Sequence, residues 1–118
     1  APGEQAIWNS EGVQTNPTAA TGLLADSGQL PVGDYIAHVI ISLNNTAAAV
    51  ASIDLQWRDA ANAANNEVQR LYYPLSAPSR DGFTFPFRSN AANERLRLIP
   101  GADITGTVSA SIWVQRAD

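Results

Sequence analysis

Residues 104–114, ITGTVSASIWV, alternate between apolar or small side chains and polar ones. The even-numbered positions hold isoleucine, glycine, valine and alanine, and the odd-numbered positions hold threonine and serine until Trp113. Successive side chains of a β-strand point to opposite faces of a sheet, so this stretch has one face for a core and one for solvent. Its β-branched residues also suit a pleated strand. We therefore predict a half-buried antiparallel strand in which Trp113 points away from the core.

Three further stretches repeat this period of two. Apolar residues alternate with polar or charged ones in residues 53–58, 83–88 and 95–98. Pro86 interrupts the second stretch, and proline has no N–H to give to a neighbouring strand. That strand is therefore predicted to lie at a sheet edge or to contain a bulge. Pro100-Gly101, which is typical of a turn, follows the third stretch.

The stretch from Gly33 to Leu43 has bulky apolar residues on both faces. Ile36 and Ile40 share one face with Asp34 and His38, whereas the opposite face is apolar throughout. A strand of this kind is either covered on both sides or takes part in an interface. We predict that Ile36 and Ile40 are interface residues.

A further strand with mixed faces at 68–75 and shorter candidates at 7–8 and 22–25 bring the total to about eight strands separated by turn residues. This pattern predicts an all-β chain, an antiparallel β-sandwich or barrel. Residues 59–69 are predicted as a loop or single turn, with an alanine-rich helix as the alternative. We expect one domain over residues 1–118, in which 1–20 form an irregular N-terminal arm and 21–118 the sandwich.

The composition excludes several kinds of site. The 118 residues contain no cysteine and one histidine, so disulfides, thiolate metal sites and multi-histidine sites are absent. The net charge of −4 argues against binding nucleic acid through phosphate neutralisation. No stretch is long and apolar enough for a membrane span, and the first residues do not look like a secretory signal.

No pattern of catalytic residues is evident. His38 is the one clear acid–base candidate, and no G-x-S-x-G nucleophile turn accompanies it. The carboxylates are scattered, and neither a calcium loop nor a glycine-rich phosphate loop is present. We therefore expect no enzyme activity, no cofactor and no bound metal.

Two surface features have competing interpretations. Arg95 and Arg97 project from one face of a predicted strand, either as an anion-contact site or as a solvated face balanced by carboxylates. Trp113 on a threonine- and serine-rich face indicates a protein partner or a sugar platform, unless the N-terminal arm covers it. Ile7 and Trp8 are the large apolar residues of that arm and are predicted to anchor it, on its own sandwich or in another subunit.

Four segments in this order resemble small jelly-roll-like β-sandwich proteins of tailed-bacteriophage virions: LADSGQLPVGDY (24–35), LQWRDAAN (55–62), AANERLRL (91–98) and TGTVSASI (105–112). The resemblance covers residues 22–116 and consists of strand and turn framework. It implies a capsid decoration (cement) protein that is made in the host bacterial cytoplasm. Its implied partners are the major capsid protein and further copies of itself, often in a homotrimer.

Two other functions remain open from the sequence. Jelly rolls also serve as carbohydrate- or receptor-binding modules, and Trp113 with Tyr72 or Tyr73 could stack on a sugar ring. An enzyme built around His38 is the third class. For the capsid decoration function, the predicted interface residues are Ile7, Trp8, Ile36, Ile40 and Trp113.

Overall fold

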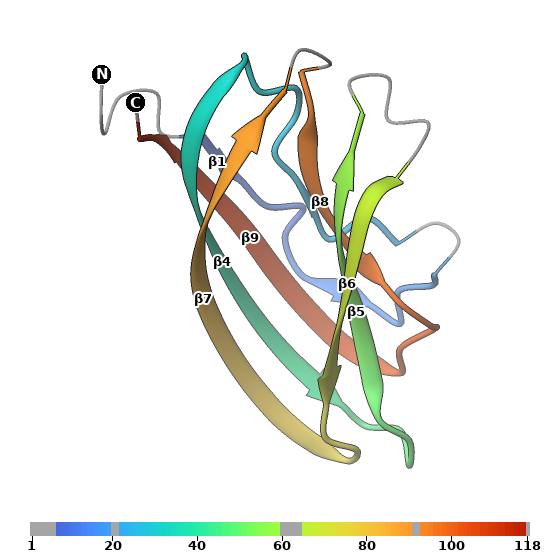
Figure 1. The fold of residues 1–118 in the computed structure, drawn as a ribbon. Helices are drawn as coiled ribbons and strands as arrows, with labels where there is room; N and C mark the ends of the chain where they lie inside the picture. Colours follow the sequence, from blue (N-terminus) through green and yellow to red (C-terminus); the bar gives the residue numbers. More distant parts are fainter. Residues whose placement is uncertain (1–6, 20–21, 60–64, 91–92, 118) are drawn as a thin grey trace.

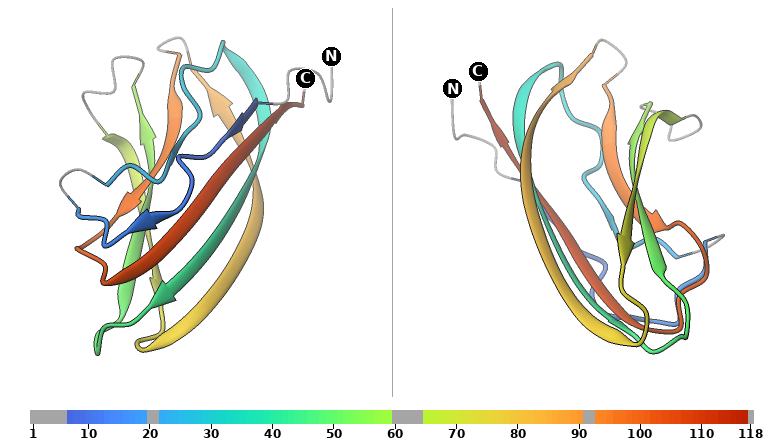
Figure 2. Two further views of the ribbon diagram at one scale, coloured as in Figure 1. Left: turned by 180° about the vertical axis from the view of Figure 1, so that it is seen from behind. Right: turned by 60° about the horizontal axis from the view of Figure 1, so that its bottom comes forward.

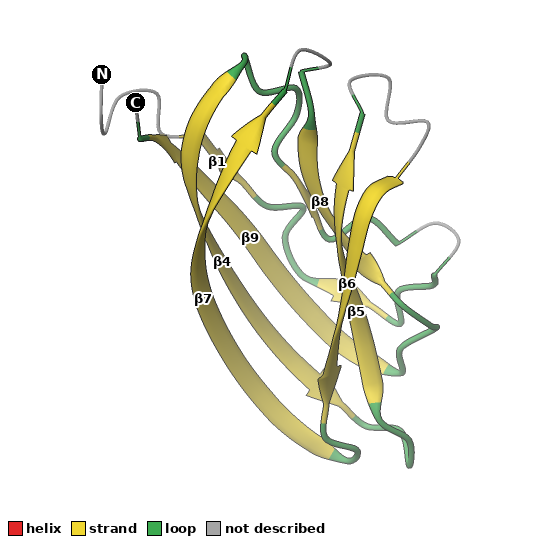
Figure 3. Ribbon diagram, in the orientation of Figure 1, coloured by secondary structure: helices red, strands yellow, loops and turns green. Residues whose placement is uncertain are grey.

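The computed structural model describes residues 7–19, 22–59, 65–90 and 93–117, with residues 7–9 and 65–68 described as backbone only. Their strands form two antiparallel sheets that face each other (Figures 1 and 2). Strands and loops make up these residues (Figure 3). None of the described segments is a helix that could span a lipid bilayer.

Sheet A has the strand order β1-β9-β4-β7, and the short strand β2 also pairs with β9. Sheet B has the order β3-β8-β5-β6. The strands of sheet A are β1 (Ile7–Asn9), β2 (Gln14–Thr15), β4 (Gly33–Asn45), β7 (Ala77–Ser89) and β9 (Gly106–Arg116). Those of sheet B are β3 (Ala25–Asp26), β5 (Ala51–Arg58), β6 (Asn65–Tyr73) and β8 (Arg95–Pro100). The chain passes from one sheet to the other at each connection from β2 onward except β5–β6, which gives a jelly-roll sandwich.

The core lies between the sheets and follows the alternation of the sequence. Most of its largest fully buried side chains come from the inward positions of β4 and β9 on one side and of β5 and β8 on the other, and the loops around β3 add Leu24 and Leu30. They include Tyr35, Ile41, Ile53, Leu96 and Ile112. The predicted apolar faces of β4 and β9 are confirmed, since every second residue from Tyr35 to Leu43 and from Val108 to Val114 is buried.

One side of the sandwich is closed by backbone contacts of the N-terminal segment. β1 pairs with β9 through Trp8 and Trp113, and the N–H of Glu11 donates to the carbonyl of Leu24, just before β3. The predicted short strand near residues 7–8 is therefore present, and it adds to the sheet of its own chain. The opposite side is open, because β7 ends sheet A there and β6 ends sheet B.

Gly106 starts β9 at a place where no side chain fits. Its φ is +129°, and an added Cβ would lie 1.9 Å from the carbonyl oxygen of Asn44. Its N–H donates to Oδ1 of Asn16, and its carbonyl accepts from the N–H of Asn16, both at 2.8 Å. The glycine thus fixes the close approach of β9, β4 and the segment before β3.

Two expectations from the sequence need correction. β6 begins at Asn65, so residues 65–67 belong to a strand rather than to the predicted loop or to its helical alternative. β7 begins at Ala77, although only residues 83–88 were predicted to be extended. Residues 77–82 are too polar to show alternation, yet they pair with β4 without a register shift. The predicted edge position of Pro86 is confirmed.

Candidate binding surfaces

The outer face of sheet A brings together three of the predicted interface residues. Ile36, Ile40 and Trp113 all project from this face, the first two from β4 and the third from the neighbouring β9. Ile40 is 54 % exposed, because its cross-strand neighbours are Gly82 and Ser111, which give it little lateral cover. Ile36 lies opposite Pro86 on β7 and is half-buried. We call this surface the outer face of sheet A.

The indole ring of Trp113 lies at the centre of this face. Its ring stacks on His38, with the centroids 4.5 Å apart and the planes inclined by 28°. The stacking leaves Trp113 half-buried rather than fully exposed. The backbone of Trp8 pairs with that of Trp113 on the other side, whereas the side chains of Ile7 and Trp8 lie outside the described part of the structure.

His38 is held by hydrogen bonds on both ring nitrogens. Nε2 lies 3.0 Å from Oε1 of Gln115, and Nδ1 lies 3.0 Å from the hydroxyl of Thr84. Oε1 of Gln115 can only accept, so Nε2–H donates to it and, in the neutral ring, Nδ1 accepts from Thr84. Neither neighbour is a carboxylate or an activated nucleophile. This arrangement orients an imidazole in a surface layer and contains no catalytic dyad.

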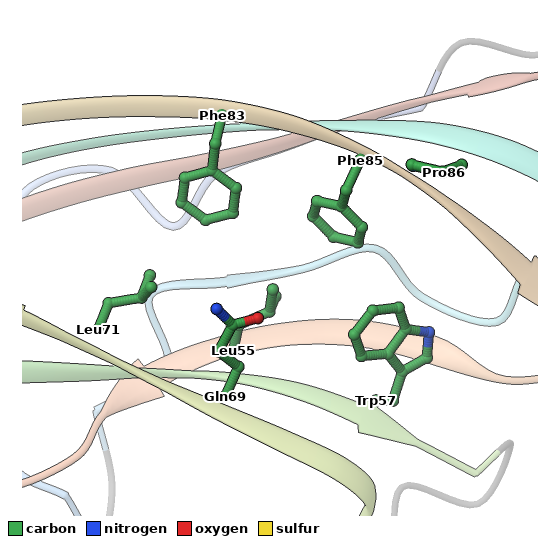
Figure 4. Close-up of a pocket in the computed structure, with 7 residues that line it drawn as sticks. All are labelled: Leu55, Trp57, Gln69, Leu71, Phe83, Phe85 and Pro86. Carbon is green, nitrogen blue, oxygen red and sulfur yellow. The ribbon is translucent and has the colours of Figure 1, made fainter.

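A second surface, a groove on the open side between β6 and β7, was not predicted from the sequence. It has a volume of about 400 Å³ and mainly apolar walls (Figure 4). Phe83 and Phe85 of β7 face it from one sheet, and Trp57 faces it from the other. Leu55, Gln69, Leu71 and Pro86 complete its walls.

The aromatic rings of the groove support one another. Trp57 meets Phe85 edge to face, with centroids 5.4 Å apart, and Phe83 stacks beside Phe85 at 6.0 Å. The three alternating phenylalanines indicated a single buried face, yet only Phe87 is buried. Phe83 and Phe85 are half-buried because no strand joins the two sheets at this side. That separation depends on tertiary structure, so no sequence pattern gives it.

The groove offers an apolar cavity with a single amide. Among the lining side chains that the structure describes, Gln69 is the one able both to donate and to accept hydrogen bonds, and none of them is titratable. Within the described residues, no group of three or more histidine and acidic side chains could hold a metal ion. The described walls of the groove can therefore bind a ligand through apolar and aromatic contact.

The prediction that Trp113 forms a sugar-binding platform together with Tyr72 or Tyr73 is wrong. Trp113 lies on the outer face of sheet A, whereas Tyr72 is 68 % exposed on β6 of sheet B and Tyr73 is buried. These rings cannot contact one sugar, because they lie on different faces of the sandwich.

Ion pairs are concentrated on the outer side of sheet B. Arg70 binds Asp54 through two hydrogen bonds, Nε to Oδ1 at 2.7 Å and Nη2 to Oδ2 at 3.1 Å. The hydrogen bond and the charge of Asp54 raise the pKa of Arg70 above its usual value. The carboxylate of Asp54, in the middle of β5, is almost fully buried beneath this partner. Arg95 and Arg97 lie on the same side of the sheet, as predicted.

Comparison with known proteins shows the fold and leaves the family open. No protein-family model matches the sequence, and neither does any curated protein. The structure of Eiger TNF from S. frugiperda has a TM-score of 0.65 at 13 % identity, over 96 % of this chain and 92 % of that one. The CBM35 of Cellvibrio japonicus Abf62 has a TM-score of 0.53 at 10 % identity, over 97 % and 99 % of the chains. PRD1 vertex protein P5 has a TM-score of 0.50 at 12 % identity, over 96 % of both chains.

At these identities the similarities concern the fold alone. They place this chain among two-layer β-sandwich structures. Solved structures of a carbohydrate-binding module and of a vertex protein share this fold. The chain is a jelly-roll β-sandwich.

Proposed function

We propose that this chain is a virion structural protein, a capsid decoration protein that binds the outer capsid surface as an oligomer and stabilises it. The main support is the outer face of sheet A, where exposed Ile40, half-buried Ile36 and Trp113 form an apolar centre. The fold shared with PRD1 vertex protein P5 is compatible with a virion component. Under this proposal the chain is made in the host bacterial cytoplasm and ends on the capsid surface.

The polar groups of this face suit burial in an interface. Both nitrogens of His38 already have partners, so covering the ring leaves no donor or acceptor unpaired. The exposed ion pair of Arg88 with Asp34, at 3.0 Å, lies towards one end of the face. An apolar centre with polar surroundings is the usual anatomy of a protein interface.

Self-association would make capsid binding multivalent. A homotrimer needs a head-to-tail contact that closes into a ring, so the outer face of sheet A would meet a different surface of the next copy. Each subunit can then bind its capsid protein weakly, because the second and third contacts form at high effective concentration. Ile7 and Trp8 stay predicted as additional anchors next to this face.

The test combines mass and capsid binding. We expect Ile40→Glu to lower the mass measured by light scattering after gel filtration and to weaken co-sedimentation with capsids that lack the protein. Val50→Glu is the matched control, since Val50 is also 54 % exposed but lies in the loop before β5. A monomeric wild-type chain, or an equal effect of both substitutions, would contradict the proposal.

A carbohydrate-binding module is the second candidate, and the aromatic groove favours it. Trp57 and Phe85 could stack on a sugar ring there, and Gln69 could bond a hydroxyl group. This alternative predicts that a glycan changes the tryptophan fluorescence of the wild type and leaves that of Trp57→Phe unchanged. A glycan screen without binding would exclude it.

A further inference from the structure

Three arginines gather on the outer side of sheet B, on the central strands β5 and β8. Arg58 and Arg95 are direct cross-strand partners, and Arg97 lies two residues further along β8, opposite Gln56. Directly opposed residues in an antiparallel pair have Cβ atoms about 5 Å apart, and like charges in such a pair repel. We call Arg58, Arg95 and Arg97 the arginine cluster.

Gln56 and Asp26 supply acceptors to this cluster. Oε1 of Gln56 accepts from Nε of Arg97 at 3.1 Å and, at a long 3.4 Å, from Nη1 of Arg58. Nη1 of Arg95 lies 3.3 Å from Oδ2 of Asp26 on β3. Its Nε is buried without a hydrogen-bond partner in the described structure. The two terminal amino groups of Arg97 also contact no acceptor in the described part of the chain.

The electrostatics of Arg97 differ from those of its neighbour Arg70. Burial, followed by the charge of Arg58, lowers the pKa of Arg97; Arg95 acts in the same direction and Asp26 opposes them. Arg70 on the same sheet is hydrogen-bonded to the carboxylate of Asp54, and its pKa is raised. Arg97 is instead a partly buried cation whose direct partner is a neutral amide. An anion placed against it would offset the repulsion and take up its free donors.

We propose that the arginine cluster binds an oxyanion, a carboxylate or a phosphate group, on the outer side of sheet B. The planar guanidinium of Arg97 would bind two oxygens through its terminal amino groups, and Arg58 and Arg95 would supply the surrounding positive charge. This site is separate from the outer face of sheet A and from the groove, so it does not depend on the proposed decoration function. The carboxylate would come from an acidic protein surface, and the phosphate from solution.

The experiment compares the wild type with Arg97→Gln, with Arg58→Gln as a second variant if the first folds poorly. The matched control is Arg88→Gln, which also removes one arginine but lies on sheet A beside Asp34. The probes are inorganic phosphate and a hexaglutamate peptide, each titrated by calorimetry and by thermal melting against sodium chloride of equal ionic strength. The chloride reference and the control remove salt effects that are common to every variant.

We expect at least one probe to bind the wild type and Arg88→Gln equally. The Kd should rise about tenfold in Arg97→Gln, the loss of a charge-assisted hydrogen bond. Binding of hexaglutamate alone would identify a carboxylate from a protein, and binding of phosphate alone would identify the free ion. The same response in wild type, Arg97→Gln and Arg88→Gln, or no binding of either probe, would overturn the proposal.

Discussion

Tyr73 links the stability of the fold to alkaline pH. Its side chain is buried at the end of β6, and its hydroxyl donates to Oδ2 of Asp81 at 3.0 Å. Burial first, and then the bond and charge of Asp81, raise the pKa of Tyr73 above its usual value near 10. Tyr73 therefore ionises at a lower pH in the unfolded chain than in the folded one. We expect the free energy of unfolding to fall above about pH 10, by at most about 1.4 kcal/mol per pH unit.

The measurement is urea unfolding between pH 9 and pH 11. This stabilising effect is fully present below the unfolded-state pKa and is lost as pH rises towards the folded one. Tyr73→Phe should flatten the decline, and Tyr72→Phe, at a 68 % exposed ring, should leave it unchanged. All basic side chains are arginine, so no lysine titrates in this range. Equal slopes in wild type and Tyr73→Phe would contradict the assignment.

At the scale of elements, β7 is an edge strand protected by two prolines. Pro78 and Pro86 both pair with β4 in an uninterrupted register. A proline has no N–H, so such a ladder can pass it only where its nitrogen faces away from the partner. The two residues are eight positions apart, so both interrupt the same outward row of donors. We expect Pro86→Thr to restore a donor on this edge and to promote strand-to-strand association between molecules.

Static light scattering at increasing protein concentration tests this. Scattering of the Pro86→Thr variant should rise at lower concentration than that of the wild type. The control Pro74→Ser changes an exposed proline in the turn between β6 and β7 and should behave like the wild type. If both variants match the wild type, the prolines do not protect this edge.

The sequence predicts strands well where one face is buried and the other is exposed to solvent. β4 and β9 show this alternation, and so their buried faces were identified correctly. Residues 77–82 of β7 carry too few apolar side chains for a pattern, and only their pairing with β4 makes them a strand. The same limit explains the groove. Trp57 and Phe85 are 28 residues apart, and their contact depends on how the sheets separate.

The candidate surfaces were predicted unevenly for a related reason. Strand parity is visible in the sequence, so it places Ile36 and Ile40 together on one face of β4 and Trp113 on the outward face of β9; the pairing of β4 with β9 then brings these faces together. The opposition of Arg58 and Arg95 requires the register between β5 and β8, which the sequence does not specify. Charged clusters of this kind become apparent only once strands are paired.

At the scale of the whole molecule, the two proposed sites lie on opposite outer sides of the sandwich. Ile40 projects from sheet A and Arg97 from sheet B, and two packed sheets are about 10 Å apart, so the side chains share no neighbour. Substitutions at distant sites without shared partners act independently. We expect Ile40→Glu to reduce the oligomer mass and to retain the wild-type response to the oxyanion probe. Arg97→Gln should keep the wild-type oligomer mass and weaken the response to the oxyanion probe. The double variant should show both a lower mass and a weaker response. If Arg97→Gln alone lowered the mass, sheet B would take part in the contact between subunits, and the oxyanion would then be a carboxylate of the neighbouring copy.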